Sequence, residues 1–311
     1  MSEDWFARRT HHWADVPLED LLERKQASGT TVSLVVPARD EAATVGPIVS
    51  RLRAALVDTA RLVDEVVVID SDSADDTAAV AADAGATVHR SADVRPDLGS
   101  VPGKGEAMWK AQFVTHGDVL VFIDADLVDW DTHFVPGLLG PLLTDRTVQL
   151  VKGFYERPLL TGDGTAYEGG RVTELVARPL IALAWPELAG LVQPLAGEWA
   201  VRRPLFASLS VPTGYAVEIA ALVDTAAARG VDAIAQVDLG RRAHTHQGLH
   251  DLGAMALQIM AATDRRRGRS ARDAVALRQY LPGRDGLTPL ERVVRTGERP
   301  PARSVPDAGA A

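Results

Sequence analysis

Residues 119–127, with the sequence VLVFIDADL, constrain the fold of this chain more than any other segment. The five apolar residues 119–123 predict a strand that is buried on both faces, as strands in the middle of a parallel sheet are. Asp124-Ala125-Asp126 follows directly, and extended alternation would place both carboxylates on one side, where they repel unless a cation or solvent separates them. The segment therefore predicts either a divalent metal site completed by phosphate oxygens or a solvated acidic turn.

Strand and helix patterns alternate along the first half of the chain. We expect strands at 32–37, 65–70 and 87–89, and helices at 43–60, 78–84 and 103–115. This order predicts an α/β fold with a doubly wound, mainly parallel sheet and right-handed crossovers. Ligands of such sheets lie beyond the carboxyl ends of the strands. The turns at 37–41, 70–72 and 124–126 should therefore converge on one crevice, which favours the metal site over the solvated turn.

The second half of the chain is less regular. It predicts strands at 148–154 and 233–239 and helices at 171–184, 216–229 and 251–266. Residues 1–30 are polar and aromatic, and we expect an N-terminal extension with a short helix at 18–25. Residues 282–311 are rich in Pro, Gly and Arg, which predicts a weakly ordered C-terminal tail.

Composition excludes several classes of protein. The chain has 311 residues, of which 46% are hydrophobic and 24% charged, as in an ordinary globular protein. A net charge of −9 argues against nucleic acid or an anionic membrane as the main partner. Cysteine is absent, so neither disulfides nor thiolate chemistry is available. No segment has the pattern of a signal peptide or the length of a membrane span, so we expect a cytoplasmic protein.

Two glycine-containing turns are candidate anion sites. Lys104 lies between two glycines at the start of a helix, where close backbone approach and free N–H groups suit a phosphate; a surface lysine in a flexible turn is the alternative. Gly169-Gly170 exposes backbone donors before Arg171, Val172 and Thr173. With the arginine fork at a helix start, this turn favours a small phosphorylated or carboxylated ligand over a plain loop.

Two glutamates and two histidines are further candidates. Glu198 and Glu218 lie beside small or apolar residues, where a carboxylate can hydrogen-bond sugar hydroxyls or stabilise positive charge at an anomeric carbon; a structural ion pair is the alternative for each. His244 and His246 alternate like the two aspartates. One of them can complete a metal's coordination, and the alternative is a solvated histidine.

With these residues described, the chain closely resembles the glucosyl-3-phosphoglycerate synthase family, which are retaining glycosyltransferases of the GT-A fold. The resemblance extends from about Trp13 to Leu281. It is carried by the ordered blocks VVPARDEAAT, VIDSDSADDT, PGKGEAMW, VFIDADL, QLVKGFYERPL, GGRVTELVARPL, LVQPLAGEWA, GYAVEI and DAIAQVDLGRRAH. It implies one GT-A domain with a nucleotide-sugar-binding half at 31–150 and an acceptor-binding half at 151–281.

The resemblance also implies ligands and residue roles. The family uses Mg²⁺ or Mn²⁺ and UDP-glucose, and transfers glucose to the 2-hydroxyl of 3-phosphoglycerate; its members are homodimers. By motif, the residues implied to hold the donor are Pro37, Ala38, Glu41, Ser71, Lys104, Asp124, Asp126, Leu195, Tyr215, Glu218 and Arg242. The metal ligands would be Asp126 and His244. The acceptor would contact Gly170, Arg171, Val172, Thr173 and His246, and the catalytic groups would be Asp126, Lys104 and Glu218.

The chain departs from the family pattern at three places. Thr245-His246-Gln247 stands where the family has a basic R-N-R segment, and Asp40 and Asp72 replace an Asn and a Gly. These changes keep open a different sugar or acceptor on the same fold. A nucleotidyltransferase is an alternative that the GGRVTEL block argues against. A non-enzymatic nucleotide-sugar-binding protein would tolerate loss of Asp124, Asp126 and His244, all of which are present.

Overall fold

One eight-stranded sheet forms the centre of the molecule in the computed structural model, which describes residues 2–156, 159–161, 164–166, 170–242, 248–283 and 286–306. The strand order is β1-β11-β6-β9-β5-β2-β3-β4. The strands are β1 (Thr10–His12), β2 (Val32–Ala38), β3 (Glu65–Asp70), β4 (Thr87–Arg90), β5 (Val119–Phe122), β6 (Leu150–Glu156), β9 (Trp199–Arg202) and β11 (Ile234–Arg241).

The sheet is parallel except for β9, which pairs antiparallel with β5 and with β6. The pairs β1–β11, β11–β6, β5–β2, β2–β3 and β3–β4 are all parallel. The predicted mainly parallel sheet is therefore confirmed, although β9 itself was not predicted. Since β5 and β6 are both antiparallel to β9, they run in the same direction as each other. The carboxyl ends of all strands except β9 therefore lie at one edge of the sheet.

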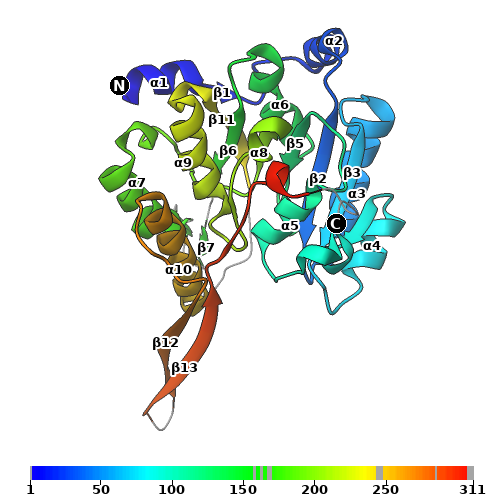
Figure 1. The fold of residues 1–311 in the computed structure, drawn as a ribbon. Coiled ribbons are helices and arrows are strands. Elements are labelled where there is room, and N and C mark those ends of the chain that lie inside the picture. Colours follow the sequence, from blue (N-terminus) through cyan, green and yellow to red (C-terminus); the bar gives the residue numbers. More distant parts are fainter. Residues whose placement is uncertain are drawn as a thin grey trace.

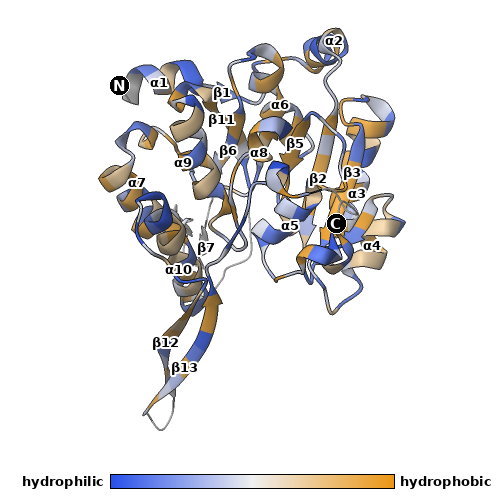
Figure 2. Cartoon of the chain, viewed as in Figure 1, coloured by the Kyte–Doolittle hydropathy of each residue, from blue (hydrophilic) through white to orange (hydrophobic). Residues whose placement is uncertain are grey.

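Helices cover both faces of the sheet, as the doubly wound prediction requires. Leu34 and Val36 pack into one apolar cluster with α3 (Val45–Leu52) and α6 (Phe134–Thr144), whereas Val35 packs into a second cluster with α5 (Lys104–Ala111) and α9 (Val217–Arg229). Alternate residues of the strand thus face opposite layers. In Figure 2, the buried strands β3 and β5 carry the hydrophobic colour that marks this core.

Residues 2–28, which we expected as an N-terminal extension, are joined to the sheet, and the short helix expected at 18–25 is present. They form α1 (Ser2–Arg9), the edge strand β1 and α2 (Leu18–Ser28). Strand β1 pairs with β11, and Trp5, which is almost fully buried, donates a 3.1 Å hydrogen bond from Nε1 to the carbonyl of Val231. The N-terminal residues therefore complete the sheet at the edge opposite to β4.

The predicted weakly ordered tail was wrong for the described residues up to 306. Strands β12 (Ala274–Gly283) and β13 (Gly286–Arg295) form a hairpin that projects from the body of the molecule (Figure 1). Strand β14 (Glu298–Arg299) then pairs antiparallel with β10 (Val211–Pro212). The C-terminal segment therefore returns to the body beside α5.

The remaining predicted helices are present with shifted ends. The helix expected at 43–60 is α3 followed by a π-helical turn at Arg53–Thr59, and that at 171–184 is a π-helical turn at Thr173–Ala177 followed by α7 (Arg178–Ala184). The helices expected at 78–84 and 251–266 are α4 (Thr77–Asp83) and α10 (Leu249–Arg266). The short helix α8 (Arg203–Phe206) was not predicted, and β7 (Leu159–Thr161) pairs antiparallel with β8 (Gly164–Ala166). Within the described ranges, no helix is long and apolar enough to cross a membrane.

Candidate active site

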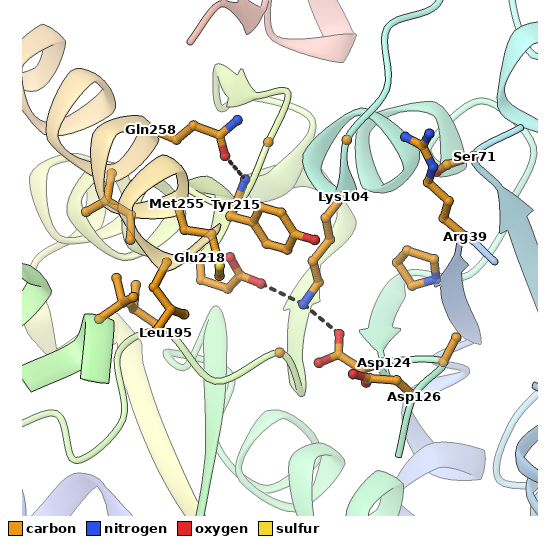
Figure 3. A pocket seen from close by; sticks show the side chains of 18 of the residues that line it. Arg39, Ser71, Lys104, Asp124, Asp126, Leu195, Tyr215, Glu218, Met255 and Gln258 are labelled. Carbon is orange, nitrogen blue, oxygen red and sulfur yellow. Dashed lines mark hydrogen bonds and ion pairs between the residues drawn. The ribbon is translucent and has the colours of Figure 1, made fainter. Parts of the chain in front are cut away.

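A pocket of about 470 Å³ lies at the carboxyl ends of β2, β3 and β5, between these strands and helices α5, α9 and α10. Apart from Glu198, it is lined by every predicted site residue that the structure describes, and Figure 3 shows several of them. The predicted residues that line it are Pro37, Ala38, Glu41, Ser71, Lys104, Asp124, Asp126, Gly170, Arg171, Val172, Thr173, Leu195, Tyr215, Glu218 and Arg242. His244 and His246 lie outside the described residues.

The acidic turns that follow the strands converge as predicted. The turn after β2 is joined to the turn after β3, because the N–H of Ser71 donates to the carbonyl of Ala38 (2.9 Å) and the N–H of Glu41 donates to Oγ1 of Thr77 (2.8 Å). Burial, and then the charge of Asp126, raise the pKa of Glu41. Negative charge is therefore concentrated at this end of the sheet, where a cation would lower its energy.

The two aspartates that depart from the family pattern occupy left-handed backbone positions. Asp40 has φ +57° and Asp72 has φ +59°, a region that Gly, Asn and Asp enter at the lowest cost. Oδ1 of Asp40 accepts the N–H of Ala74 (2.7 Å), and Asp72 lies 3.9 Å from Arg90. Neither side chain lines the pocket. The contacts of both side chains therefore lie outside the pocket, and the left-handed backbone is one that aspartate enters at low cost.

Lys104 joins two carboxylates across the pocket. Its Nζ lies 2.6 Å from Oδ1 of Asp124 and 2.9 Å from Oε1 of Glu218, and Figure 3 shows the ammonium between them. Burial alone would lower the pKa of Lys104, but the two carboxylates outweigh this effect and hold it well above its ordinary value. Lys104 is therefore a permanent positive charge that faces the pocket.

The glycines beside Lys104 have a different role from the predicted one. A Cβ at Gly103 would lie 2.1 Å from the carbonyl oxygen of Thr213, and one at Gly105 would lie 1.8 Å from that of Pro212. The N–H groups of Gly105 and Glu106 donate to Gly214 (3.2 Å) and Thr213 (2.9 Å). The glycines thus admit the neighbouring backbone, and these two amides are not free for a phosphate. The helix start supplies the Lys104 side chain instead.

Arg242 contacts both aspartates of the turn at 124–126. Its Nη2 lies 3.4 Å from Oδ2 of Asp124 and 3.2 Å from Oδ1 of Asp126. Two side chains that reach the same guanidinium must project to the same side, as the alternation argument predicted. Burial and then the charge of Asp124 raise the pKa of Asp126, although Arg242 and Lys104 act in the opposite direction.

Of the two candidate glutamates, only Glu218 faces the pocket. Glu198 is fully buried and does not line it; its carboxylate accepts hydrogen bonds from Nη1 of Arg242 (2.8 and 3.0 Å) and from the hydroxyl of Tyr155 (2.8 Å). For Glu198 the structural ion pair is therefore correct and contact with a sugar is wrong.

The opposite wall contains the predicted acceptor turn and residues that the sequence did not indicate. Gly170 has φ +88°, Arg171 is exposed, and Val172 and Thr173 are buried behind it. Helix α10 adds the residues Leu252, Met255, Gln258 and Ile259. The side chain of Gln258 accepts the N–H of Tyr215 (2.9 Å) and donates to the carbonyl of Arg295 (2.9 Å). A helical period predicts α10 but not which face meets the pocket.

The carboxylates fit a hard divalent cation, which prefers oxygen ligands. Burial and the charge of Asp124 raise the pKa of Asp126, so a cation bound there would stabilise its ionised form. Within the part of the chain that the structure describes, no three His, Asp or Glu side chains are placed to hold an ion by themselves. A further protein ligand would have to come from the remaining residues, and the predicted ligand His244 is among them.

Acidic turns that share a pocket with Lys104, at the carboxyl edge of a mainly parallel sheet, are expected of a glycosyltransferase that uses a nucleotide sugar. Comparison with known proteins supports this class. The model of glycosyl transferase family 2 matches residues 33–170. Glucosyl-3-phosphoglycerate synthase from Mycolicibacterium smegmatis is 44% identical over 302 residues, which are 97% of this chain and 98% of that protein. The chain belongs to the glucosyl-3-phosphoglycerate synthase family.

Further relatives agree with this membership. Glucosyl-3-phosphoglycerate synthase from Petrotoga mobilis is 36% identical over 99% of this chain and 97% of its own length. The crystal structure of the Mycobacterium tuberculosis enzyme in complex with Mn²⁺, UDP and phosphoglyceric acid has a TM-score of 0.85 at 43% identity, covering 95% of this chain and 98% of that one. These comparisons do not favour the alternative of a different donor or acceptor.

Proposed function

We propose that this chain is a retaining hexosyltransferase that moves glucose from UDP-glucose to the 2-hydroxyl of 3-phosphoglycerate in the presence of Mg²⁺ or Mn²⁺. The observation that carries the proposal is that Lys104, Asp124 and Asp126 line the same pocket as the turn at Gly170–Thr173. It supplies cationic and metal-binding groups on one wall and a small-anion site on the other. The similarity to ligand-bound relatives over nearly the whole chain supports the same substrates.

The donor is assigned to the strand-end wall. Pro37, Ala38, Glu41 and Ser71 would hold uridine, and Asp124 and Glu218 would accept hydrogen bonds from ribose or glucose hydroxyls. Asp126, the aspartate of the Asp-x-Asp motif nearer to solvent, would bind the metal together with His244. Tyr215, Arg242 and the backbone of Leu195 complete this wall. When bound, the metal neutralises charge on the diphosphate.

Lys104 has the central chemical role in this mechanism. Its ammonium is fixed by two carboxylates and needs little reorganisation when negative charge develops on the departing diphosphate, which lowers the barrier. Asp124 and Glu218 are both bound to Lys104, so neither is placed as an enzymic nucleophile. We therefore propose that the bond from C1 to the phosphate oxygen breaks as the acceptor oxygen bonds C1 from the same face. That phosphate oxygen takes the acceptor's proton.

The acceptor is assigned to the opposite wall. Arg171 is exposed at the start of the helical segment, and it can present a bidentate fork to a phosphate or carboxylate. Gly170 and Thr173 would add backbone and hydroxyl donors beside it, and Val172 packs behind. His246 is proposed as a further acceptor contact. For the whole protein we also propose a homodimer and a cytoplasmic location, which the resemblance and the composition predict.

The test is an acceptor-dependence assay with the purified full chain. UDP release from UDP-glucose and Mg²⁺ is followed with 3-phosphoglycerate or with glycerate, which lacks the phosphate, and the product is weighed by mass spectrometry. We expect release that requires 3-phosphoglycerate, a product heavier by one hexose, and a much higher KM for glycerate. Equal turnover with glycerate would contradict the proposed phosphate site, and release without any acid would contradict the transfer.

A further inference from the structure

Arg242 is held by two sets of partners at unequal distances. Nη1 donates to the hydroxyl of Tyr155 at 2.6 Å and to the two carboxylate oxygens of Glu198 at 2.8 and 3.0 Å. Nη2 reaches Asp126 only at 3.2 Å and Asp124 only at 3.4 Å. Charge-assisted hydrogen bonds are strongest below about 2.9 Å. The guanidinium is therefore bound tightly on its buried side and weakly on the side that faces the pocket.

The tight side is a closed unit below the pocket. Glu198 is fully buried at the residue before β9, and Tyr155, 2% exposed, comes from β6. The Tyr155 hydroxyl also donates to Glu198 at 2.8 Å, and its ring stacks on Phe134 with centroids 6.2 Å apart. The rings and the sheet exclude water from Glu198. A ligand in the pocket therefore cannot displace Glu198 from Arg242.

We propose that Glu198, supported by Tyr155, is a positioning residue that restrains Arg242 and thereby keeps Asp126 available to a divalent cation. Glu198 and the aspartate pair compete for one guanidinium. If the Glu198 charge were removed, Asp124 and Asp126 would be the carboxylate partners left to Arg242 among the described residues, and Arg242 would approach them and oppose metal binding. The inference rests on the proposed function only in requiring that a divalent cation binds at Asp126.

The test measures metal binding directly rather than turnover. Free Mn²⁺ is titrated by electron paramagnetic resonance into the full chain with saturating UDP. Glu198→Gln keeps the shape and removes the charge, and we expect the Kd for Mn²⁺ to rise about ten- to a hundredfold, the effect of one charge-assisted hydrogen bond. Tyr155→Phe keeps the charge and removes one hydroxyl, so it should raise the Kd by a smaller factor, about two- to tenfold.

A double variant separates positioning from general structural damage. Adding Arg242→Gln to Glu198→Gln removes the competing cation, and we expect tighter Mn²⁺ binding than in Glu198→Gln alone. A merely structural role of Glu198 would give no such rescue. The matched control is Glu298→Gln, which removes a partly buried carboxylate 2.7 Å from Arg266 away from the pocket; its Kd for Mn²⁺ should equal that of the wild type.

Each outcome decides the inference. A Kd for Mn²⁺ within twofold of the wild type in folded Glu198→Gln overturns it, and so does a double variant that binds no better than the single one. If Glu198→Gln does not fold, an unchanged Kd in Tyr155→Phe overturns it instead. If the wild type with UDP binds no Mn²⁺, the proposed metal site fails first and the inference fails with it, whatever the variants show.

Discussion

Lys104 and Arg242 are two cations that both contact Asp124, yet they are placed differently. Lys104 shares Asp124 with Glu218, and all three side chains line the pocket. Arg242 shares Asp124 with Glu198, which is fully buried and lies outside the lining. The Lys104 side chain is 16% exposed and that of Arg242 is 5% exposed. One cation has its countercharges in the pocket, and the other has its main countercharge beneath it.

The difference shows how one acidic turn can be both rigid and reactive. A ligand that enters the pocket can contact Lys104 together with both of its carboxylate partners, because all three side chains line the space it fills. It does not reach Glu198, which is fully buried outside the lining, and separating Glu198 from Arg242 would cost several kcal/mol. Arg242 therefore keeps its main partner when a ligand binds, whereas Lys104 meets the ligand directly. The predictions below test this contrast, beginning with the largest effect.

A third cation, Arg299, forms an ion pair with a buried carboxylate away from the pocket. Its Nε and Nη2 each lie 2.7 Å from Glu106, which is 1% exposed on α5. Arg299→Met leaves this carboxylate buried and unpaired, so we expect the free energy of unfolding to fall by about 3–5 kcal/mol. Urea denaturation measures it.

The matched variant for Arg299 removes both charges. Glu106→Gln combined with Arg299→Met leaves no unpaired charge, and we expect it to recover more than half of the stability lost by Arg299→Met alone. If Arg299→Met lowers the free energy of unfolding by less than about 1 kcal/mol, the Arg299–Glu106 pair behaves as an exposed one. Burial of the carboxylate partner would then no longer distinguish Arg242 from Lys104.

Replacing the pocket-facing cation should affect chemistry more than stability. Lys104→Ala removes the positive charge nearest to the departing diphosphate, and we expect kcat to fall about 10²- to 10³-fold, as on loss of one preorganised donor. Steady-state UDP release measures it. Lys25→Ala is the control, because it breaks another lysine ion pair, 2.9 Å from Asp64, outside the pocket. Equal losses in the two variants would contradict the role of Lys104.

Lys152 tests the opposite extreme, a fully buried ammonium for which the described residues provide no carboxylate within ion-pair distance. Its Nζ donates to the carbonyl of Ala196 and lies 5.8 Å from the ring centre of Trp199. Burial lowers the pKa of Lys152 to about 8. Between this value and the ordinary value of about 10.4, the unfolded chain binds the extra proton, so stability should rise with pH.

The measurement for Lys152 is the difference in unfolding free energy between the wild type and Lys152→Met. Urea denaturation at several pH values between about 7.5 and 10 follows it, and the comparison cancels other titrating groups. We expect the wild type to gain up to about 1.4 kcal/mol per pH unit over the variant above pH about 8. A difference independent of pH would mean that Lys152 is solvated or paired in the folded state.

The donor wall could be predicted from the sequence because it follows a general rule. Acidic turns that end parallel strands must meet at one edge of the sheet, so the convergence of Glu41, Ser71 and Asp126 needed only the strand assignments. The prediction that Gly170–Thr173 contact the acceptor rested on the resemblance to the family. The face of α10 that carries Gln258 depends on how that helix packs, which no local pattern specifies. The glycines beside Lys104 were misinterpreted because close backbone approach serves a ligand and a neighbouring segment equally well.

The C-terminal hairpin was missed for a different physical reason. Pro282 and Pro289 lie in β12 and β13, and proline argues against a strand in a sheet interior because it cannot donate to the ladder. Each strand of an isolated two-stranded ribbon has a free edge, so a proline can place its missing donor on that edge. Composition alone therefore favoured a weakly ordered tail, and the antiparallel pairing of β12 with β13 decided otherwise.

The smallest expected effect concerns Asp40, where a charge lies next to the pocket without lining it. Because φ is +57° and Oδ1 accepts the N–H of Ala74, Asp40→Asn keeps both the favoured backbone region and the acceptor. We expect its unfolding free energy to change by less than about 0.5 kcal/mol, with a Kd for UDP within threefold of the wild type. Asp40→Ala loses both features and should destabilise the chain by about 1–2 kcal/mol. A large gain in UDP affinity in Asp40→Asn would show that the charge of Asp40 acts on the pocket. The contrast between Lys104 and Arg242 assumes that only charges lining the pocket act on the ligand, so this result would contradict it.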